Sequence, residues 1–426
     1  MNTLLCLSIA LAAGLFMSRL SKVLNLPSVT AYLVAGIIVG PYCLGRLGIE
    51  GLGFISGDNV KEFEIISKVA LGFIAFAIGN EFRLSQLKQV GKKATFIGIF
   101  QAFVATFCVD VALIGLHFVL GEKLPLPMAI TLGAVAAATA PAATLMVVRQ
   151  YKAKGKLTDL LLPIVAIDDA VGLIIFAVSF GVSKALIHGE FSIAAIVLEP
   201  ILEIVCSVAL GAIMGVLFTF CEKFFSSNSK RLSLSITFVI LTVAISMMKF
   251  NVGGIHIGFS TLLVCMMLGT MFCNLCDFSA EIMDKTDKWT NPLFTLFFVL
   301  SGAELEFDVF TDLAIIGIGV AYIATRSFGK YYGAYVSAKL SRCDKSTTKY
   351  LGITLLPQAG VALGMSVTAM ELGEVGHLIR NIVLFSVLIY ELVGPMLTKI
   401  ALTKAGEIVP KEPHHHRKNR TAPSKV

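Results

Sequence analysis

Two adjacent carboxylates, Asp168 and Asp169, stand in the middle of an aliphatic stretch at residues 160–175. An ionisable side chain at the centre of such a stretch, in a helix within a bilayer, costs on the order of 3 kcal/mol. Helical neighbours lie about 100° apart, so the two acids face different surroundings and can have separate roles. Both cannot stay charged in a low dielectric without a counter-ion. Either one of them binds a proton, or a cation or a basic group lies nearby. The pair therefore indicates a site at which protons and a small cation compete.

Basic partners stand much later in the chain, where Arg326 and Lys330 interrupt another apolar stretch. They are four residues apart and share one face of a helix. Lysine can release its proton when buried, whereas arginine stays charged and suits a permanent ion pair. A competing interpretation is that both lie near a helix end and extend to lipid headgroups. The residue types leave open which of the two pairs with Asp168.

Two further acids, Asp110 and Glu391, also lie inside apolar runs. For these we expect a structural ion pair or a position near the membrane interface, and either can balance Arg326.

Two apolar stretches are interrupted, by Ala-Thr-Ala-Pro at residues 138–141 and by Leu-Pro-Gln-Ala-Gly at 356–360. Broken helices expose carbonyl oxygens, which hard monovalent cations bind, and paired breaks are typical of a transporter's midplane site. Pro and Gly are also common in membrane helices generally. The residues at the breaks are Pro141, Pro357, Gln358 and Gly360, and side-chain oxygens are available there from Thr139, Thr144 and Gln358.

Composition determines which elements hold these residues. Apolar residues make up 56% and charged residues 15% of the 426 positions, and the mean hydropathy is +0.83. A soluble protein needs more polar surface than this. Runs of 18 or more apolar residues recur, each long enough to cross a bilayer as a helix. We therefore predict an all-α membrane protein, with the lipid bilayer as a partner.

We read thirteen apolar segments as transmembrane helices. They lie at residues 2–18, 28–45, 63–82, 94–119, 126–150, 158–184, 191–222, 231–249, 253–275, 290–304, 308–339, 348–369 and 379–403. Lysine and arginine gather in the loops after the odd-numbered segments, which the positive-inside rule places in the cytoplasm. This predicts a membrane domain at 1–405 with its N-terminus outside, followed by a basic cytoplasmic tail at 406–426.

The net charge of +7 lies mostly in these loops and in the tail, so no nucleic-acid partner is expected. No Ser/His/Asp or metal-ligand cluster is apparent in the sequence, and we expect neither an enzyme nor a cofactor. The segments at 94–184 and 308–403 repeat one order, in which a long helix, an interrupted helix and a helix with ionisable groups follow each other. The two interrupted helices are seven segments apart and run in opposite directions, which predicts inverted repeats.

These motifs resemble those of the cation:proton antiporter-2 family, relatives of the bacterial electrogenic sodium/proton antiporters. The likeness spans about residues 25–400. The Leu-Pro to Gly-Pro pattern at 26–41 is similar to the family's second helix, and residues 138–141 and 357–362 are similar to its two unwound helices. Asp168-Asp169 resembles its paired-aspartate motif, and Gly329-Lys330 its Gly-Lys helix.

The resemblance implies a sodium/proton antiporter fold with two crossed discontinuous helices. It implies that Asp169 is the main cation and proton carrier, and that Asp168 forms a salt bridge with Lys330 that breaks on ion binding. It further implies a homodimer, in which a core at about 94–184 and 308–403 moves against dimerisation helices at about 2–82 and 191–304. Paired aspartates imply two protons exchanged per sodium ion.

We therefore predict exchange of Na⁺ (or Li⁺) for H⁺ by alternating access in a bacterial cytoplasmic membrane, with a role in pH homeostasis. The first alternative is K⁺/H⁺ exchange, because the sequence does not fix the radius of the site. A sodium-coupled symporter of an organic anion is the second, although two acids with few free basic groups discourage an anionic cargo.

Overall fold

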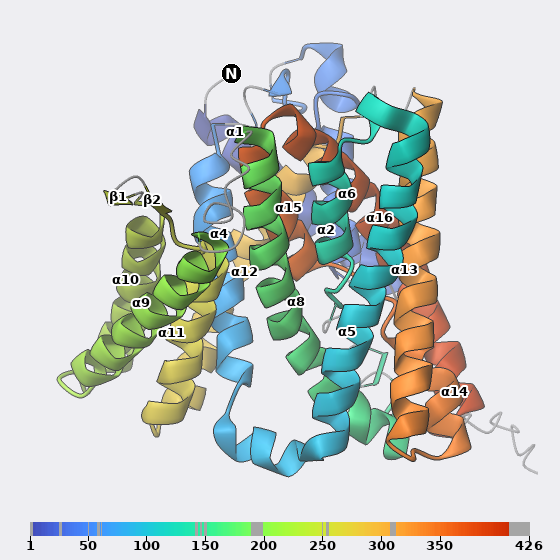
Figure 1. The fold of residues 1–426 in the computed structure, drawn as a ribbon. Helices are drawn as coiled ribbons and strands as arrows, with labels where there is room; N and C mark the ends of the chain where they lie inside the picture. Colours follow the sequence, from blue (N-terminus) through green and yellow to red (C-terminus); the bar gives the residue numbers. More distant parts are fainter. Residues whose placement is uncertain are drawn as a thin grey trace, which may run out of the picture.

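The computed structural model describes residues 3–24, 28–49, 51–57, 60, 62–140, 144, 147–148, 151–188, 199–248, 250–252, 255–306 and 312–408. Almost all secondary structure in this part of the chain is helical (Figure 1). The helices before the first break are α1 (Thr3–Leu24), α2 (Ser28–Val39), η1 (Leu44–Leu47), α4 (Glu64–Glu81), α5 (Leu84–Leu120), η2 (Gly121–Lys123) and α6 (Leu126–Val135). The next are α8 (Lys156–His188), α9 (Glu199–Glu222), α10 (Asn228–Ser246), α11 (Thr261–Leu275) and α12 (Ser279–Ala303). The last are α13 (Leu313–Leu340), α14 (Lys345–Thr354), α15 (Gly360–Ala369), η5 (Met370–Leu372) and α16 (Glu374–Lys404).

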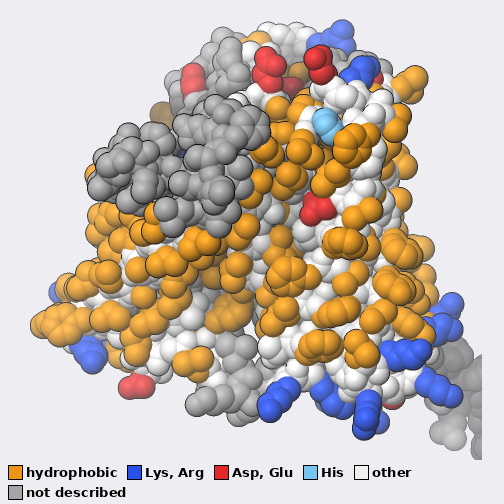
Figure 2. All heavy atoms as spheres, viewed as in Figure 1, with side chains coloured by type: hydrophobic (Ala, Val, Ile, Leu, Met, Phe, Trp, Pro, Cys, Tyr) orange, Lys and Arg blue, Asp and Glu red, His pale blue; other side chains and the backbone are white. Residues whose placement is uncertain are grey.

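Seven helices in the described part of the chain are individually long and apolar enough to span a membrane. They are Ser28–Leu47, Gly91–Lys123, Lys156–Ile187, Ile201–Glu222, Asn228–Ser246, Leu313–Leu340 and Glu374–Lys404. Hydrophobic side chains cover the middle of the face in Figure 2, and Lys and Arg gather at the end where α14 lies. On α5, Phe103, Phe107 and Val111 follow each other at one-turn intervals and are 57%, 67% and 56% exposed. Such a stripe suits contact with lipid.

The helices lie along the apolar segments, but several boundaries differ from prediction, and three of these differences have a clear physical reason. Helix α12 begins at Ser279, well before the predicted 290, because its first turns are polar and hydropathy does not detect them. The segment predicted at 253–275 becomes helical only at Thr261. Before it, β1 (Phe250–Val252) and β2 (Ile255–Ile257) form a short antiparallel ribbon. The β-branched residues there favour strands, so the prediction of helix at 255–257 was wrong. The predicted segment that starts at residue 94 omits the first turns of α5. A kink at Gly91 (φ 74°) separates these turns from the rest of the helix.

The helices pack in two groups, seen on opposite sides of Figure 1. Helices α9, α10 and α11 lie on one side with α4, which packs against α11, and α5, α13 and α14 lie on the other. Helix α5 packs along α13, while α8 contacts both α5 and α6. Gly329 and Gly333 allow the close approach of α13 to α5. A Cβ at these positions would lie 2.8 Å from Ala105 Cα and 2.9 Å from Gln101 Cα. Small residues four apart are a common means of bringing membrane helices together.

Two helices are interrupted within the bundle. After α6 the chain leaves helical geometry at residues 136–140, which we call the first break. Between α14 and α15 it does so at residues 355–359, the second break. Each break places the carboxyl end of a half-helix, with its unsatisfied carbonyls and partial negative charge, inside the protein. Pro141 lies outside the described residues.

Candidate functional site

The two breaks contact each other directly. The amide of Ala140 donates to the carbonyl of Pro357 over 2.8 Å. The side-chain Nε2 of Gln358 donates to the carbonyl of Val135, the last residue of α6, over 2.9 Å, and the hydroxyl of Thr144 donates to the carbonyl of Thr354, the last residue of α14, over 3.2 Å. Each break thus satisfies backbone groups that the other leaves open, and the predicted break residues Pro357 and Gln358 lie at this junction.

Arg326 binds the carboxyl ends of both half-helices. Its guanidinium donates to the carbonyls of Ala136 (3.1 Å) and Ala138 (2.6 Å) in the first break and of Leu356 (2.8 Å) in the second. It also lies over the ring of Tyr390, 4.4 Å from the centroid. The side chain is 0% exposed, so it does not extend to lipid headgroups. A permanent cation against helix carboxyl ends complements their partial negative charge.

Lys330, one turn further along α13, forms the ion pair with the aspartates. Its Nζ lies 2.6 Å from Asp168 Oδ2, and both side chains are 0% exposed. The same Nζ donates to Thr139 Oγ1 over 2.9 Å and to the carbonyl of Ala137. Of the two basic residues on this face, Lys330 therefore pairs with Asp168, while Arg326 binds carbonyls.

Asp168 has two more donors besides Lys330. Thr139 donates its hydroxyl to Oδ2, and Gln101 on α5 donates its amide to Oδ1. Asp169 is 1% exposed and follows on α8, facing a different direction. We call Asp168, Asp169, Lys330, Thr139 and Gln101 the charged cluster. It brings together residues from α5, α8, α13 and the first break.

Sequence reasoning missed Gln101 and Tyr322. Tyr322 lies on the Arg326 face of α13, and its hydroxyl accepts from Gln358 over 3.0 Å. A single uncharged polar residue in an apolar helix carries little signal, since such residues often bond their own backbone. The spacing of Gly329 and Gly333 could have pointed to Gln101, because small residues four apart indicate which face of α13 packs most closely against a neighbouring helix.

The other predicted residues lie further from this cluster. Asp110 and Glu391, proposed as partners of Arg326, form no ion pair within the described residues, and each has a buried carboxylate oxygen without a hydrogen-bond partner there. That expectation was wrong because backbone carbonyls, not carboxylates, surround Arg326. Asp110 instead packs on Gly133 of α6, where a Cβ would meet its carboxylate. Gly360 begins α15 at the end of the second break.

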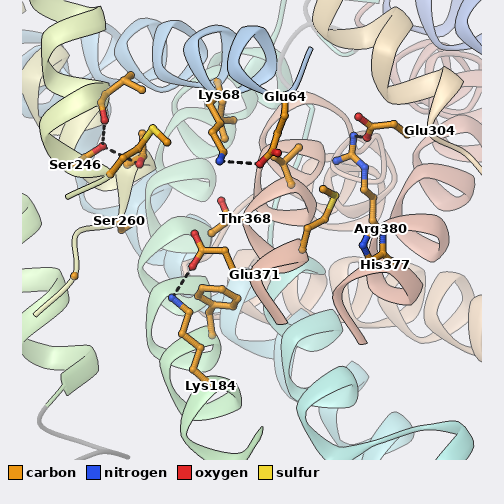
Figure 3. A pocket seen from close by; sticks show the side chains of 18 of the residues that line it. Glu64, Lys68, Lys184, Ser246, Ser260, Glu304, Thr368, Glu371, His377 and Arg380 are labelled. Atoms are coloured by element: carbon orange, nitrogen blue, oxygen red, sulfur yellow. Dashed lines mark hydrogen bonds and ion pairs between the residues drawn. The ribbon is translucent and has the colours of Figure 1, made fainter. Parts of the chain in front are cut away.

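A cavity of about 1020 Å³ lies at the end of the molecule opposite α14. Helix ends and loops line it, and ion pairs on its wall join Glu64 to Lys68, Lys184 to Glu371, and Glu304 to Arg380 (Figure 3). Of the described residues that line it, none belongs to the charged cluster. Phe180, on its wall, follows Asp169 by 11 residues of α8, or about 16 Å along the helix. The cluster is therefore closed off from this cavity.

Relatives align along most of the chain. The protein named "Probable Na(+)/H(+) antiporter 3" of Methanocaldococcus jannaschii is 23% identical over 391 residues, which cover 89% of this chain and 92% of that protein. The ammonium/H(+) antiporter subunit AmhT of Alkalihalophilus pseudofirmus is 24% identical over 292 residues, covering 67% of this chain and 66% of that one.

Among solved structures, that of the sodium proton antiporter MjNhaP1 from Methanocaldococcus jannaschii at pH 8 aligns with a TM-score of 0.73. It covers 94% of this chain and 97% of that chain at 18% identity, so the likeness establishes the fold. The predicted antiporter fold, built of several apolar membrane-spanning helices, is confirmed by it. The model of the family described as "Sodium/hydrogen exchanger, transmembrane" matches residues 7–404. The chain therefore belongs to the sodium/hydrogen exchanger family of multi-pass membrane transporters.

Proposed function

We propose that the protein exchanges Na⁺ or Li⁺ for H⁺ by alternating access, with net movement of charge, in a bacterial cytoplasmic membrane. The observation that carries this proposal is the fully buried ion pair between Lys330 and Asp168, 2.6 Å long, beside Asp169. Such a pair is often no more stabilising than apolar groups of similar volume. Its presence therefore favours a role in transport.

The charges of the cluster allow a coupled exchange. With Asp168 and Asp169 ionised and Lys330 protonated, two negative charges and one positive charge leave a net −1, which a proton on Asp169 neutralises. A cation bound at Asp169 displaces that proton and competes with Lys330 for Asp168. When Lys330 also releases its proton, two protons leave for each cation and one net charge moves. When Lys330 keeps its proton, the exchange is one for one and electroneutral.

The distribution of Lys and Arg supports one orientation of the protein in the membrane. Lys and Arg side chains gather at the end of the molecule where α14 lies (Figure 2), and the positive-inside rule assigns such an end to the cytoplasm. With thirteen spans, the N-terminus then lies outside and the C-terminus inside. The 1020 Å³ cavity opens at the opposite end, on the outer side. Cations leaving and protons entering pass through it when the core moves.

We take α5, α6, α8 and α13 to α16 as the moving core, and α1, α2, α4 and α9 to α12 as a scaffold that pairs in a homodimer. The ion pair between Arg380 on α16 and Glu304 after α12 joins the two groups. Asn381 adds a second link, since its Oδ1 accepts from the amide of Glu306 over 2.9 Å. Movement of the core requires these contacts to break.

The names of the relatives differ in the cation that they give. Relatives of similar identity are named for sodium in one case and for ammonium in another, so K⁺ or NH₄⁺ exchange is the second candidate. Asp168 supports the paired-aspartate, electrogenic type and with it the antiporter-2 branch of the family. Its pairing with Lys330 gives the site the second releasable proton that this type requires.

The test uses purified protein in liposomes that carry a pH-sensitive dye and an imposed membrane potential. Na⁺ or Li⁺ is expected to drive proton movement faster than K⁺ or NH₄⁺, with a rate that depends on the potential. Asp169→Asn is expected to abolish it, while Asp159→Asn, in the first turn of the same helix, leaves it unchanged. A full rate in Asp169→Asn would exclude the mechanism, and a rate insensitive to the potential would exclude its electrogenic form.

A further inference from the structure

Gln101 is a member of the charged cluster to which no role has been assigned. It lies on α5 and is 0% exposed. Its Nε2 donates to the carbonyl of Gly98 over 3.0 Å and to Asp168 Oδ1. It reaches the cluster from α5, and it binds Oδ1 of Asp168, whereas Lys330 binds Oδ2.

The orientation of the amide follows from its neighbours. A carbonyl and a carboxylate both accept hydrogen bonds, so the NH₂ group must face them and the amide oxygen must point elsewhere. That oxygen, Oε1, is buried and accepts no hydrogen bond from any described residue. A buried carbonyl oxygen without a donor is unfavourable unless water or a cation occupies the space beside it.

Packing keeps the amide in place. A Cβ at Gly333 of α13 would lie 3.3 Å from Gln101 Cβ and 2.9 Å from its Cα, so this glycine seats α13 directly on the residue. The Cα and Cβ atoms of Gln101 are thus held by α13, and its amide group is held by Asp168. A preorganised oxygen of this kind can bind an ion without reorganising.

From these contacts, and resting on the cation/proton exchange proposed above, we propose that Gln101 is a ligand of the transported cation. Its NH₂ group orients Asp168, and its Oε1 supplies a neutral oxygen to the partly dehydrated ion. An amide oxygen binds hard cations but takes up no proton at physiological pH. The residue therefore biases the competition in the cluster toward the cation.

The test compares the cation and pH dependence of exchange in liposomes. Gln101→Leu keeps the volume of the side chain and removes both polar groups, and Gln101→Asn withdraws them by one methylene. Both are expected to raise the half-saturating Na⁺ or Li⁺ concentration at least tenfold and to move the active range to higher pH, because protons then compete better. The matched control is Thr106→Val on the same helix, since its buried hydroxyl also has no described partner but lies outside the cluster.

Binding is measured separately as the rise in melting temperature that Na⁺ or Li⁺ produces in detergent. This rise is expected to shrink in both Gln101 variants and to persist in Thr106→Val. A variant that folds but loses only maximal rate, with its cation and pH dependence unchanged, would show that Oε1 holds water or nothing, and would overturn the inference. An inactive wild-type protein would instead remove the proposed exchange itself.

Discussion

The two breaks have equivalent places in the repeated order of helices, yet they have different partners. The first break directs three successive carbonyls toward the basic residues of α13. Its Thr139 lies against Asp168. The second break directs one carbonyl, that of Leu356, to Arg326, and its Gln358 binds the carbonyl of Val135, just before the first break. The two breaks, alike in their order along the chain, thus have unequal contacts with the basic residues of α13.

The different contacts of the two breaks suggest different roles, although their sequence motifs look alike. The first break contacts the groups that can exchange protons and cations, so changes there should alter the ion dependence of transport. The second break holds the first in shape, so changes there should lower stability and leave ion dependence alone. Among the described contacts, Arg326 binds both breaks and Lys330 binds the first, so substitutions of these two basic residues test the division directly.

The largest effect is expected for Lys330→Gln. It leaves Asp168 buried without its counter-ion, a change that typically lowers the free energy of unfolding by about 3–5 kcal/mol. The double variant Asp168→Asn/Lys330→Gln should recover most of this loss, because no unpaired charge remains, but it should not recover the proposed electrogenic exchange. Thermal unfolding in detergent and potential-driven proton flux measure the two effects. If the double variant stays as unstable as the single one, the ion pair is not the cause.

Arg326→Gln should have the next largest effect. Glutamine can replace one of the three bonds to carbonyls, and the remaining carbonyls stay buried without a donor, so we expect a loss of about 2–4 kcal/mol. The surviving protein should keep its half-saturating cation concentration, because Arg326 touches neither aspartate among the described contacts. A shift of that concentration tenfold or more would place Arg326 in the ion site and weaken the division between the breaks.

The parts of this arrangement that sequence could predict are those that violate the rules for apolar helices. Asp168, Asp169 and Lys330 stand out because charge in such helices is expensive, and the breaks stand out through Pro and Gly. The partners of Arg326 could not be read in the same way. Every residue has a carbonyl, and only the geometry of the breaks shows which carbonyls are free.

Gln101 illustrates a second limit. It is 67 positions from Asp168, and its contact depends on the packing of α5 against α8, which the sequence pattern does not give. Hydropathy likewise gave the centres of the helices but not their ends. The polar first turns of α12 and the ribbon before α11 lie where apolar content no longer distinguishes a helix from other structure.

Gln358→Leu and Thr139→Val compare the breaks with a single substitution in each. Gln358 makes hydrogen bonds to the carbonyl of Val135 and to Tyr322, and its loss should cost about 1–3 kcal/mol in stability with unchanged ion dependence. Thr139→Val keeps the shape but removes a donor to Asp168 and an acceptor for Lys330. Its half-saturating cation concentration should rise roughly tenfold, equivalent to about 1.4 kcal/mol. The reverse assignment of effects would contradict the comparison.

The smallest effect concerns how the two broken helices begin. Helix α14 has an N-cap, since Asp344 accepts from the amide of Thr347 over 3.1 Å and from its hydroxyl over 2.7 Å. Helix α6 begins after Pro125 with no side-chain cap. Asp344→Ala should therefore lower stability by about 1 kcal/mol, which is a shift of about 1–2 °C in a chain of this size.

The effect of Asp344→Ala should also depend on pH. The bonds from the Thr347 hydroxyl and then its amide hold the pKa of Asp344 below its usual range. A carboxyl whose pKa is lower in the folded state stabilises the protein above the unfolded pKa, near 4, and loses that contribution as pH falls through the folded value. The gap in melting temperature between wild type and variant should thus be full at pH 7 and narrow below about pH 4. A gap that stays constant over this range would mean that the charge of Asp344 does not support the cap, and that α14, like α6, depends on packing alone for its start.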